Sequence, residues 1–275
     1  MSRLEVVPRQ SAPPVWVSLR QEAERAAREE PTLASLLNAV VLSHTGLADA
    51  LSYQLARKLG DQELRAMSAR EIAQEAFESD PSLIVASEAD LRAVFERDPA
   101  CKGYVQPFLF FKGFLALQTH RVAHWLWTHR RETLALYLQS KTSEVFQVDI
   151  HPAARIGSGV FIDHGTGIVI GETAVVGDDV SMLHGVTLGG TGAEQGDRHP
   201  KIGRGVLLSA GAKVLGNITV GDYAKVAAGS VVLKNVPAHC TAAGVPARLI
   251  NCPTCDEPAK TMDQSLADAL FDYDI

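Results

Sequence analysis

Apolar side chains recur every six residues between Ile150 and about Val236. Each unit opens with a branched or long apolar residue, and its fifth place holds a small or β-branched residue. The openers are Ile150, Ile156, Ile162, Ile170, Val176, Met182, Leu188, Ile202, Leu208, Val214, Val220, Val226 and Val232. The fifth places are Ala154, Val160, Thr166, Ala174, Val180, Val186, Val206, Ala212, Ile218, Ala224, Ser230 and Val236. Because no helix has a period of six, the pattern predicts a β-helix of hexapeptide repeats.

Each hexad is expected to form one side of a triangular coil, and stacked coils bury the openers in one column. Two breaks interrupt the period. We expect the first to be a two-residue bulge at Ile168 and Val169, and the second to be an eight-residue excursion from Glu194 to Lys201. Since solenoids often carry function in insertions, the second break is the stronger functional clue.

The chain before the repeats has the apolar spacing of helices. Pro31 is expected to open one helix, because proline is tolerated in a first helical turn. Thr45 is expected to cap the next helix, and Ser68 with Glu71 to form a capping box. Such helices need a surface to cover, which can be the β-helix, one another or a second subunit.

The domain organisation follows from these two patterns. We predict an α+β fold with a helical domain at residues 1–146, a hexapeptide β-helix domain at 147–248 and a flexible C-terminal tail at 249–275.

Three hexads complete one coil, so equivalent places in successive coils stack about 4.8 Å apart. The third place of each hexad is expected to point outward near a corner. One column of third places reads His164, His184, Ala210 and Ala228. It combines two imidazoles with small side chains beyond them, which predicts a reactive end attached to a shallow groove for a long, thin ligand.

His164 is the candidate general base of this site. Asp163 precedes it and Asp149 lies fifteen residues earlier. Either carboxylate could fix the tautomer of the imidazole and raise its basicity, and the spacing does not decide between them. Arg198 in the excursion can hold a carboxylate with a two-pronged hydrogen bond, and His199 offers a donor beside it. A corner histidine bonded to a backbone carbonyl is the structural alternative for His164.

Composition limits the classes of function. The chain has 275 residues, of which 46% are apolar and 21% charged, as in one large or two medium globular domains. A net charge of −6 without a long basic run argues against nucleic acid as a partner. The sequence has neither a signal-peptide pattern nor an apolar span of membrane length, so we expect a cytoplasmic protein without a membrane partner.

The cysteines and the helical histidines suggest no metal. Cys101, Cys240, Cys252 and Cys255 do not form the pattern of a disulfide framework. Zinc at Cys252 and Cys255 would need two further ligands, so we interpret these two residues as free thiols. The histidines between residues 120 and 129 are interpreted as polar positions on packed helices.

Several motifs together resemble those of the serine O-acetyltransferases, a family of hexapeptide-repeat acyltransferases. In the β-helix they are DIHP at 149–152, IDHGTGIVIGET at 162–173, VTLGGTG at 186–192, DRHPKI at 197–202, GAKVLGN at 211–217 and AAGVPAR at 242–248. RDPA at 97–100 and HWLW at 124–127 extend the resemblance into the helices, so it covers about residues 30 to 250.

The resemblance implies that an acetyl group is transferred from acetyl-CoA to the hydroxyl of L-serine. The product would be O-acetyl-L-serine, and the reaction the first step of cysteine biosynthesis from serine. His164 would remove the proton of the serine hydroxyl as it attacks the thioester. No covalent acyl-enzyme is then needed, because the substrate brings its own nucleophile.

The resemblance also assigns roles to the neighbours of His164. Asp149 would orient it. Asp98 and Asp163 would receive the substrate ammonium. Arg198 with His199 would hold the substrate carboxylate or the developing oxyanion, and His199 is counted among the catalytic residues.

Acetyl-CoA is expected to be the co-substrate, and no metal is expected. We place its binding along Ala210 and Ala228, with Gly190 and Thr191 beside it.

The family also suggests an assembly and partners. It implies a left-handed β-helix in a homotrimer or a dimer of trimers, with active sites between neighbouring β-helices, and L-cysteine as feedback inhibitor. The terminal Ile275 is expected to bind O-acetylserine sulfhydrylase. Tyr273 replaces the flexible glycine common at that place in the family, which puts this partner in doubt.

Three alternatives stay open. Some hexapeptide β-helix trimers are zinc carbonic anhydrases with three histidines across an interface, a set that His164, His184 and His199 could imitate. An acetyltransferase acting on another hydroxyl acceptor is the second alternative. A scaffold whose β-helix only trimerises is the third.

Overall fold

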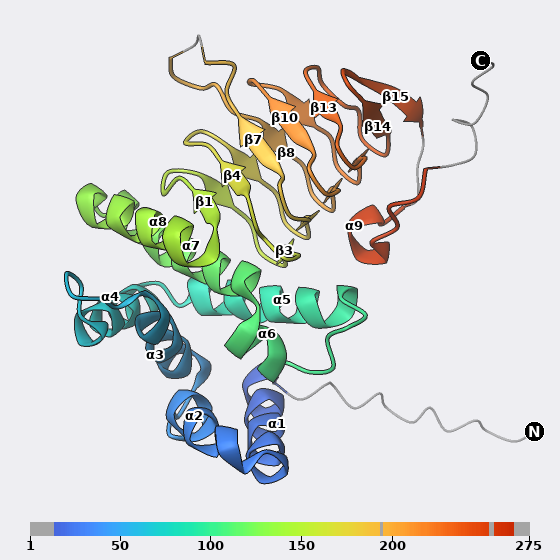
Figure 1. The fold of residues 1–275 in the computed structure, drawn as a ribbon. Helices are drawn as coiled ribbons and strands as arrows, with labels where there is room; N and C mark the ends of the chain where they lie inside the picture. Colours follow the sequence, from blue (N-terminus) through green and yellow to red (C-terminus); the bar gives the residue numbers. More distant parts are fainter. Residues whose placement is uncertain (1–13, 193–194, 253–255, 267–275) are drawn as a thin grey trace, which may run out of the picture.

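The computed structural model describes residues 14–192, 195–252 and 256–266. Helices form one end of the molecule, a parallel β-helix rises from them, and a short helix lies beside the β-helix (Figure 1). The helices are α1 (Val15–Glu29), η1 (Pro31–Leu33), α2 (Ala34–Leu37), η2 (Asn38–Leu42), α3 (Leu47–Leu59), α4 (Ala66–Ser79), α5 (Ser82–Arg97), α6 (Val105–Phe110), α7 (Lys112–Thr128), α8 (Glu132–Phe146) and α9 (Pro258–Thr261).

Three sheets form the sides of the coil. Sheet A contains β1 (Val148–Ile150), β4 (Ile168–Ile170), β7 (Thr187–Gly189), β10 (Lys213–Leu215) and β13 (Val231–Val232). Sheet B contains β2 (Arg155–Ile156), β5 (Val175–Val176), β8 (Lys201–Ile202) and β11 (Thr219–Val220). Sheet C contains β3 (Phe161–Ile162), β6 (Ser181–Met182), β9 (Leu207–Leu208), β12 (Lys225–Val226), β14 (Thr241–Gly244) and β15 (Ala247–Asn251).

The hexad openers form the core of the coil, as predicted. In sheet C, Ile162 pairs with Met182, Met182 with Leu208, and Leu208 with Val226. All the openers are buried except Ile156, which is half-buried. Burying a column of branched apolar side chains is the main contribution to the stability of such a solenoid.

The first break does not lie where the sequence analysis put it. Ile168 and Val169 are regular residues of β4, paired with Val148 and Asp149 of β1. Ile168 is 1% exposed and fills the buried fifth place, whereas Thr166 is exposed. The predicted bulge at Ile168 and Val169 is therefore wrong.

The two inserted residues are His164 and Gly165. Both have left-handed backbone angles, with φ of 57° and 73°, and these turn the chain out of the coil and back. The Gly185 amide donates to the Thr166 carbonyl, the bond that elsewhere joins the fourth and third places of stacked hexads. Thr166 thus occupies the third place beneath His184, and His164 projects from the insertion instead of stacking in register.

The helical part covers the first coil. Helices α7 and α8 lie against β1, and α5 and α7 against β3 (Figure 1). Pro31 opens the helical segment η1 as predicted. The two predicted caps are wrong, because α3 and α4 start from extended backbone at Gly46 and Arg65, so that Thr45 precedes its helix and Ser68 lies within one.

Cys240 and Cys252 form a disulfide bond, which corrects the interpretation of Cys252 as a free thiol. Cys240 precedes β14 and Cys252 follows β15, and the antiparallel pairing of these strands brings their Cα atoms to 4.4 Å. Directly opposed residues of an antiparallel pair have this separation. Cys101 is free and buried, and Cys255 lies outside the described residues.

The β14–β15 hairpin covers the end of sheet C. Residues 249–251, assigned to the tail from the sequence, are part of β15. Helix α9 then packs on the coil, where the Ser181 hydroxyl donates to the Ala259 carbonyl at 2.8 Å. Ile275 and Tyr273 lie outside the described residues.

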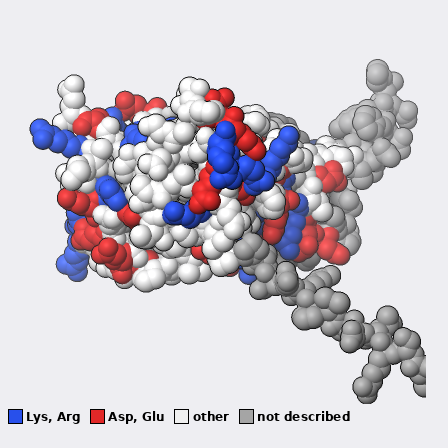
Figure 2. All heavy atoms as spheres, turned by 90° about the horizontal axis from the view of Figure 1, so that it is seen from below, with Lys and Arg blue, Asp and Glu red and all other residues white. Residues whose placement is uncertain are grey.

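Charged side chains are mixed on the helical end. Lys and Arg alternate with Asp and Glu in small groups separated by uncharged areas (Figure 2). No described helix combines the length and the apolar character that a membrane crossing requires.

Candidate active site

His164 stands at the corner between sheets C and A, on the inserted pair of residues. Its side chain is 72% exposed, and its Nε2 lies 3.7 Å from Oδ1 of Asp163. The His164 and His184 rings meet edge to face with centroids 5.9 Å apart. The predicted pair of imidazoles is therefore present, although the insertion and not the regular stacking brings the rings together.

Asp163 occupies a more enclosed position. Burial raises the pKa of its carboxyl, Asp98 raises it further, and His164 and His184 oppose the shift. Asp98 ends α5, and its Oδ1 accepts a hydrogen bond from the Ala100 amide at 2.8 Å. The two carboxylates predicted to receive an ammonium group therefore act on each other electrostatically across the junction of the two domains.

Asp149 lies on the outward side of sheet A, between the buried Val148 and Ile150. Its Oδ1 accepts a hydrogen bond from Nε2 of Gln139 at 2.7 Å. Among the described residues, the carboxylate within ion-pair distance of His164 belongs to Asp163.

The excursion returns to the coil in register with the hexad beneath it. The Val175 amide donates to the Pro200 carbonyl, as the Arg155 amide does to the carbonyl of Ala174 one coil below. Pro200 therefore stacks on Ala174. Counting back from Pro200 places His199 above Thr173 and Arg198 above Glu172.

Arg198 and His199 are held by these two residues below them. An Nη of Arg198 donates to Oε2 of Glu172 at 2.7 Å. The backbone amides of Arg198 and His199 both donate to the Thr173 hydroxyl oxygen at 3.0 Å. This corner therefore presents a guanidinium and an imidazole in fixed positions.

The His199 imidazole lies against a glycine. A Cβ atom at Gly171 would stand 2.0 Å from Nε2 of His199, so only glycine fits there. His199 is 7% exposed, and burial lowers its pKa. Arg198 lowers this pKa further, and Glu172 opposes the shift.

His151 belongs to the same corner. Burial lowers its pKa, and its charge interacts with those of Glu172, Asp149 and Arg198. Its Nδ1 accepts a hydrogen bond from the Ala153 amide at 3.1 Å.

The residues expected to bind acetyl-CoA also fall at two corners. Ala210 and Ala228 continue the column above His184 between sheets C and A, where the Gly229 amide donates to the Ala210 carbonyl. Gly190 stands beside Arg198 between sheets A and B, and the exposed Thr191 follows it. Within one chain, sheet A therefore lies between two groups of site residues. His164 and His184 lie at the corner on one side of it, and Arg198 and His199 lie at the corner on the other side.

Glu172, Thr173 and His151 belong to this corner, but they are not among the site residues predicted from the sequence. A forward count from the openers Ile170 and Leu188 puts Gly190 above Glu172 and leaves no place for the excursion. Counting backward from the opener Ile202 would have identified Glu172 and Thr173 as the supports of Arg198 and His199. His151 carries no such signal.

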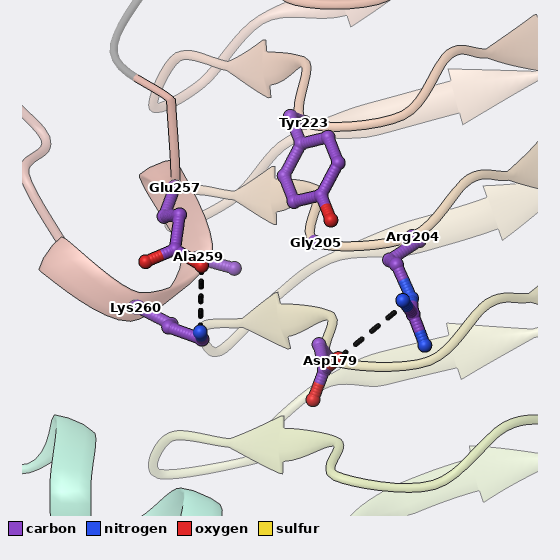
Figure 3. Close-up of a pocket in the computed structure, with 7 residues that line it drawn as sticks. All are labelled: Asp179, Arg204, Gly205, Tyr223, Glu257, Ala259 and Lys260. Atoms are coloured by element: carbon purple, nitrogen blue, oxygen red, sulfur yellow. Dashed lines mark hydrogen bonds and ion pairs between the residues drawn. The ribbon is translucent and has the colours of Figure 1, made fainter.

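A polar pocket of about 200 Å³ opens at the third corner, between sheets B and C (Figure 3). Its ion pairs join Lys260 to Glu257 at 2.6 Å and Arg204 to Asp179 at 3.8 Å. None of the predicted site residues lines it. The lining residues are Asp179, Arg204, Gly205, Tyr223, Glu257, Ala259 and Lys260.

A triangular coil of hexapeptide repeats with reactive side chains on its corners is the architecture of the hexapeptide transferases. The family model for the bacterial transferase hexapeptide (six repeats) matches residues 199–234, and the model for the N-terminal region of serine acetyltransferase matches residues 15–119. The chain belongs to the serine acetyltransferase family. It is an acyltransferase that acetylates serine with acetyl-CoA as co-substrate.

Known relatives cover almost the whole chain. The serine acetyltransferase of Salmonella typhimurium is 54% identical over 250 residues, which are 91% of this chain and 92% of the relative. A solved serine acetyltransferase in complex with cysteine has a TM-score of 0.90 and 53% identity, and the match covers 92% and 98% of the two chains. The Brucella abortus serine acetyltransferase in complex with coenzyme A has a TM-score of 0.87 and 52% identity, with 89% and 97% covered.

This membership decides against the carbonic anhydrase and scaffold alternatives. Among the described residues, no group of three or more His, Cys, Asp or Glu side chains is arranged to hold a metal ion.

Proposed function

We propose that His164 is the general base that removes the proton of the serine hydroxyl during attack on the acetyl thioester. The observation that carries this role is the exposed imidazole on the inserted left-handed pair, 3.7 Å from the Asp163 carboxylate. A neighbouring carboxylate favours the imidazolium that forms as the proton is taken. Transfer is direct, without an acyl-enzyme.

The charges around both corners suit the two ends of an amino acid. Asp98 and Asp163 offer carboxylates to the ammonium group, and an ammonium between them would relieve the repulsion that contributes to the raised pKa of Asp163. Arg198 and His199 offer donors to the substrate carboxylate or the developing oxyanion. Glu172 keeps the guanidinium in place before substrate arrives.

The separation of these groups supports a site shared between subunits. The His164 corner and the Arg198 corner lie on opposite sides of sheet A, so one amino acid cannot reach both within one chain. A trimer with neighbouring β-helices side by side brings the His164 corner of one copy to the Arg198 corner of the next. Acetyl-CoA would then lie along Ala210 and Ala228 of one copy, beside Gly190 and Thr191 of the other.

In this trimer the orienting partner of His164 would be Asp149, and the helical parts would pair two trimers. Both assignments rest on the resemblance to the family. Asp149 lies on the outward side of sheet A, which places it toward the neighbouring β-helix in that arrangement.

Product and regulation follow from the chemistry of serine. O-acetyl-L-serine carries a good leaving group for the later synthesis of cysteine, which makes this reaction the first step of that route. Cysteine differs from serine only by a thiol in place of the hydroxyl, and a related structure is a complex with cysteine. L-cysteine would therefore occupy the same ammonium and carboxylate contacts and inhibit the enzyme.

The C-terminal Ile275 would bind O-acetylserine sulfhydrylase, the enzyme that uses the product. A terminal isoleucine can contribute an apolar side chain and a free carboxylate to such an interface.

Replacing His164 by asparagine tests the proposal. Asparagine tolerates the left-handed backbone at this place, so the fold should persist while the base is lost. We expect kcat to fall by roughly 10²- to 10⁴-fold and the pH profile to lose its lower limb. Release of the CoA thiol would be measured with serine, homoserine and sugar acceptors, which also tests the alternative of another acceptor.

His239→Asn is the matched control, because His239 has the same backbone conformation, with φ of 55°, at the corner between sheets B and C. It should retain wild-type activity. A His164→Asn enzyme within threefold of wild type would remove His164 from the mechanism.

A further inference from the structure

Several hydrogen bonds join Thr173 to Arg198 and His199. Its hydroxyl oxygen accepts the backbone amides of Arg198 and His199, both at 3.0 Å. The same oxygen lies 2.9 Å from Nδ1 of His199, and the Thr173 amide donates to this Nδ1 at 3.2 Å. The contacts fix a direction for each proton.

The proton count assigns the tautomer of His199. A hydroxyl has one proton to donate and two lone pairs to accept with. Both accepting positions of Thr173 are used by backbone amides, so its proton points to Nδ1 at 2.9 Å, with the Asp197 carboxylate as a second acceptor nearby. With two donors directed at it, Nδ1 of His199 must be the unprotonated nitrogen, and the ring proton lies on Nε2.

We propose that Thr173 is a positioning residue that holds His199 as the neutral tautomer with its proton on Nε2. This nitrogen then presents a hydrogen-bond donor to the acceptor's carboxylate or to the oxyanion of the transition state. The inference rests on the proposed role of His199 in that contact. A donor held in place before the reaction stabilises developing charge without reorganisation.

The charged groups around the ring agree with a neutral imidazole. Arg198, Lys201 and His151 all lower the pKa of His199, together with burial, and Glu172 opposes them. Protonation would place a second cation beside Arg198 and would put a proton on the nitrogen at which Thr173 already directs two.

Lys201 gives the loop a second anchor besides the Thr173 hydroxyl. Nζ of Lys201 donates to the Thr173 and His199 carbonyls at 3.0 and 2.6 Å, and it contacts Oδ1 of Asp197 at 2.6 Å. Removing only the hydroxyl therefore leaves this second anchor of the excursion in place. Valine still leaves the Arg198 and His199 amides without their acceptor, so the tautomer needs a measurement of its own.

Thr173→Val and Thr173→Ser test the inference in the full-length enzyme. Valine keeps the shape and removes the hydroxyl, whereas serine keeps the hydroxyl. We expect valine to lower kcat/KM for serine by at least about tenfold, because it removes the donor to Nδ1 and the acceptor of two backbone amides, and serine to stay within about threefold of wild type. Thr219→Val is the control, because it makes the same change at an exposed threonine of β11.

Two measurements distinguish positioning from structure. Without the hydroxyl donor, Nδ1 accepts a proton more readily, so the pKa of His199, followed by its ring ¹⁵N shifts against pH, should rise in Thr173→Val. The ¹⁵N shifts of the His199 ring should show an unprotonated Nδ1 in wild type and a mixture of tautomers in Thr173→Val. A protonated Nδ1 in wild type, or identical shifts in both proteins, would overturn the inference.

The proposed role of His199 can fail separately. If His199→Asn leaves the kinetics unchanged, His199 does not contact the reacting groups, whereas the ¹⁵N shifts still report whether Thr173 sets the tautomer.

Discussion

Single atoms decide the geometry at the Arg198 corner. The His199 ring fills the space in which a Cβ atom of residue 171 would lie, so this position requires glycine. The ring also depends on Thr173 for its tautomer, so two residues beneath it determine how it meets a substrate. Neither residue needs to touch the substrate.

Gly171→Ala should displace the His199 ring. A Cβ atom 2.0 Å from Nε2 forces the ring to move by about an ångström, and a misplacement of that size can cost about 10²-fold in rate. We expect kcat/KM for serine to fall by about 10²-fold, as measured by release of the CoA thiol. Gly46→Ala is the control, because nothing lies within 4 Å of a Cβ there. Wild-type kinetics for Gly171→Ala would show that His199 is not needed in this position.

At the scale of elements, a buried ion pair between two helices is also hydrogen-bonded to the coil. Asp90 of α5 is fully buried, and its Oδ2 accepts from an Nη of Arg121 in α7 at 2.6 Å. Its Oδ1 accepts from the Val160 amide of the first coil at 2.9 Å, and Gln118 donates to Oδ2 at 2.9 Å. The carboxylate therefore fixes α5, which ends at Asp98, relative to the coil that carries Asp163.

Asp90→Ala should be strongly destabilising, because it leaves Arg121 as an unpaired buried charge. We expect the free energy of unfolding to fall by about 3 to 5 kcal/mol in urea titrations. Glu88→Ala removes a partly exposed pair with Arg92 at 3.9 Å on the same helix and should change it by less than about 1 kcal/mol. Equal losses for the two variants would contradict the special role of the buried pair.

At the scale of the whole molecule, the interface between helices and coil encloses a neutral histidine. His120 of α7 is fully buried, and burial lowers its pKa well below 6.5, with further lowering by His124, Arg121 and His151. The Ala154 carbonyl of the first coil opposes this shift. Folding therefore excludes a proton that the unfolded chain binds below about pH 6.5.

The pH dependence of stability follows in sign from this histidine. Well above pH 6.5 the group is neutral in both states and contributes no slope. As the pH falls below 6.5, the unfolded chain binds the proton first, so stability decreases by up to about 1.4 kcal/mol per pH unit. His120→Gln should flatten this slope between pH 6.5 and 5 in urea titrations, whereas the exposed His129→Gln should not. An unchanged slope in His120→Gln would assign the acid sensitivity to other groups.

The sequence by itself determined the fold class, the register of the regular hexads and the family. A six-residue period of apolar residues indicates a hexapeptide β-helix. Each hexad carries its own buried opener, so the register can be read from the sequence wherever the period is unbroken. The motifs around His164 and Arg198 were sufficient to identify a serine acetyltransferase, because the side chains that carry the chemistry are named directly by the sequence.

Only the tertiary structure decided what happens at the breaks. An insertion shifts the count by an unknown number of places, so the sequence could not show that His164 projects from the added pair, and it could not show the hydrogen bonds that join His199 to Thr173. The Cys240–Cys252 bond likewise depends on a hairpin that lies outside the hexad period. The hexad count places the two groups of site residues at different corners, but only the structure shows which residues each corner brings into contact.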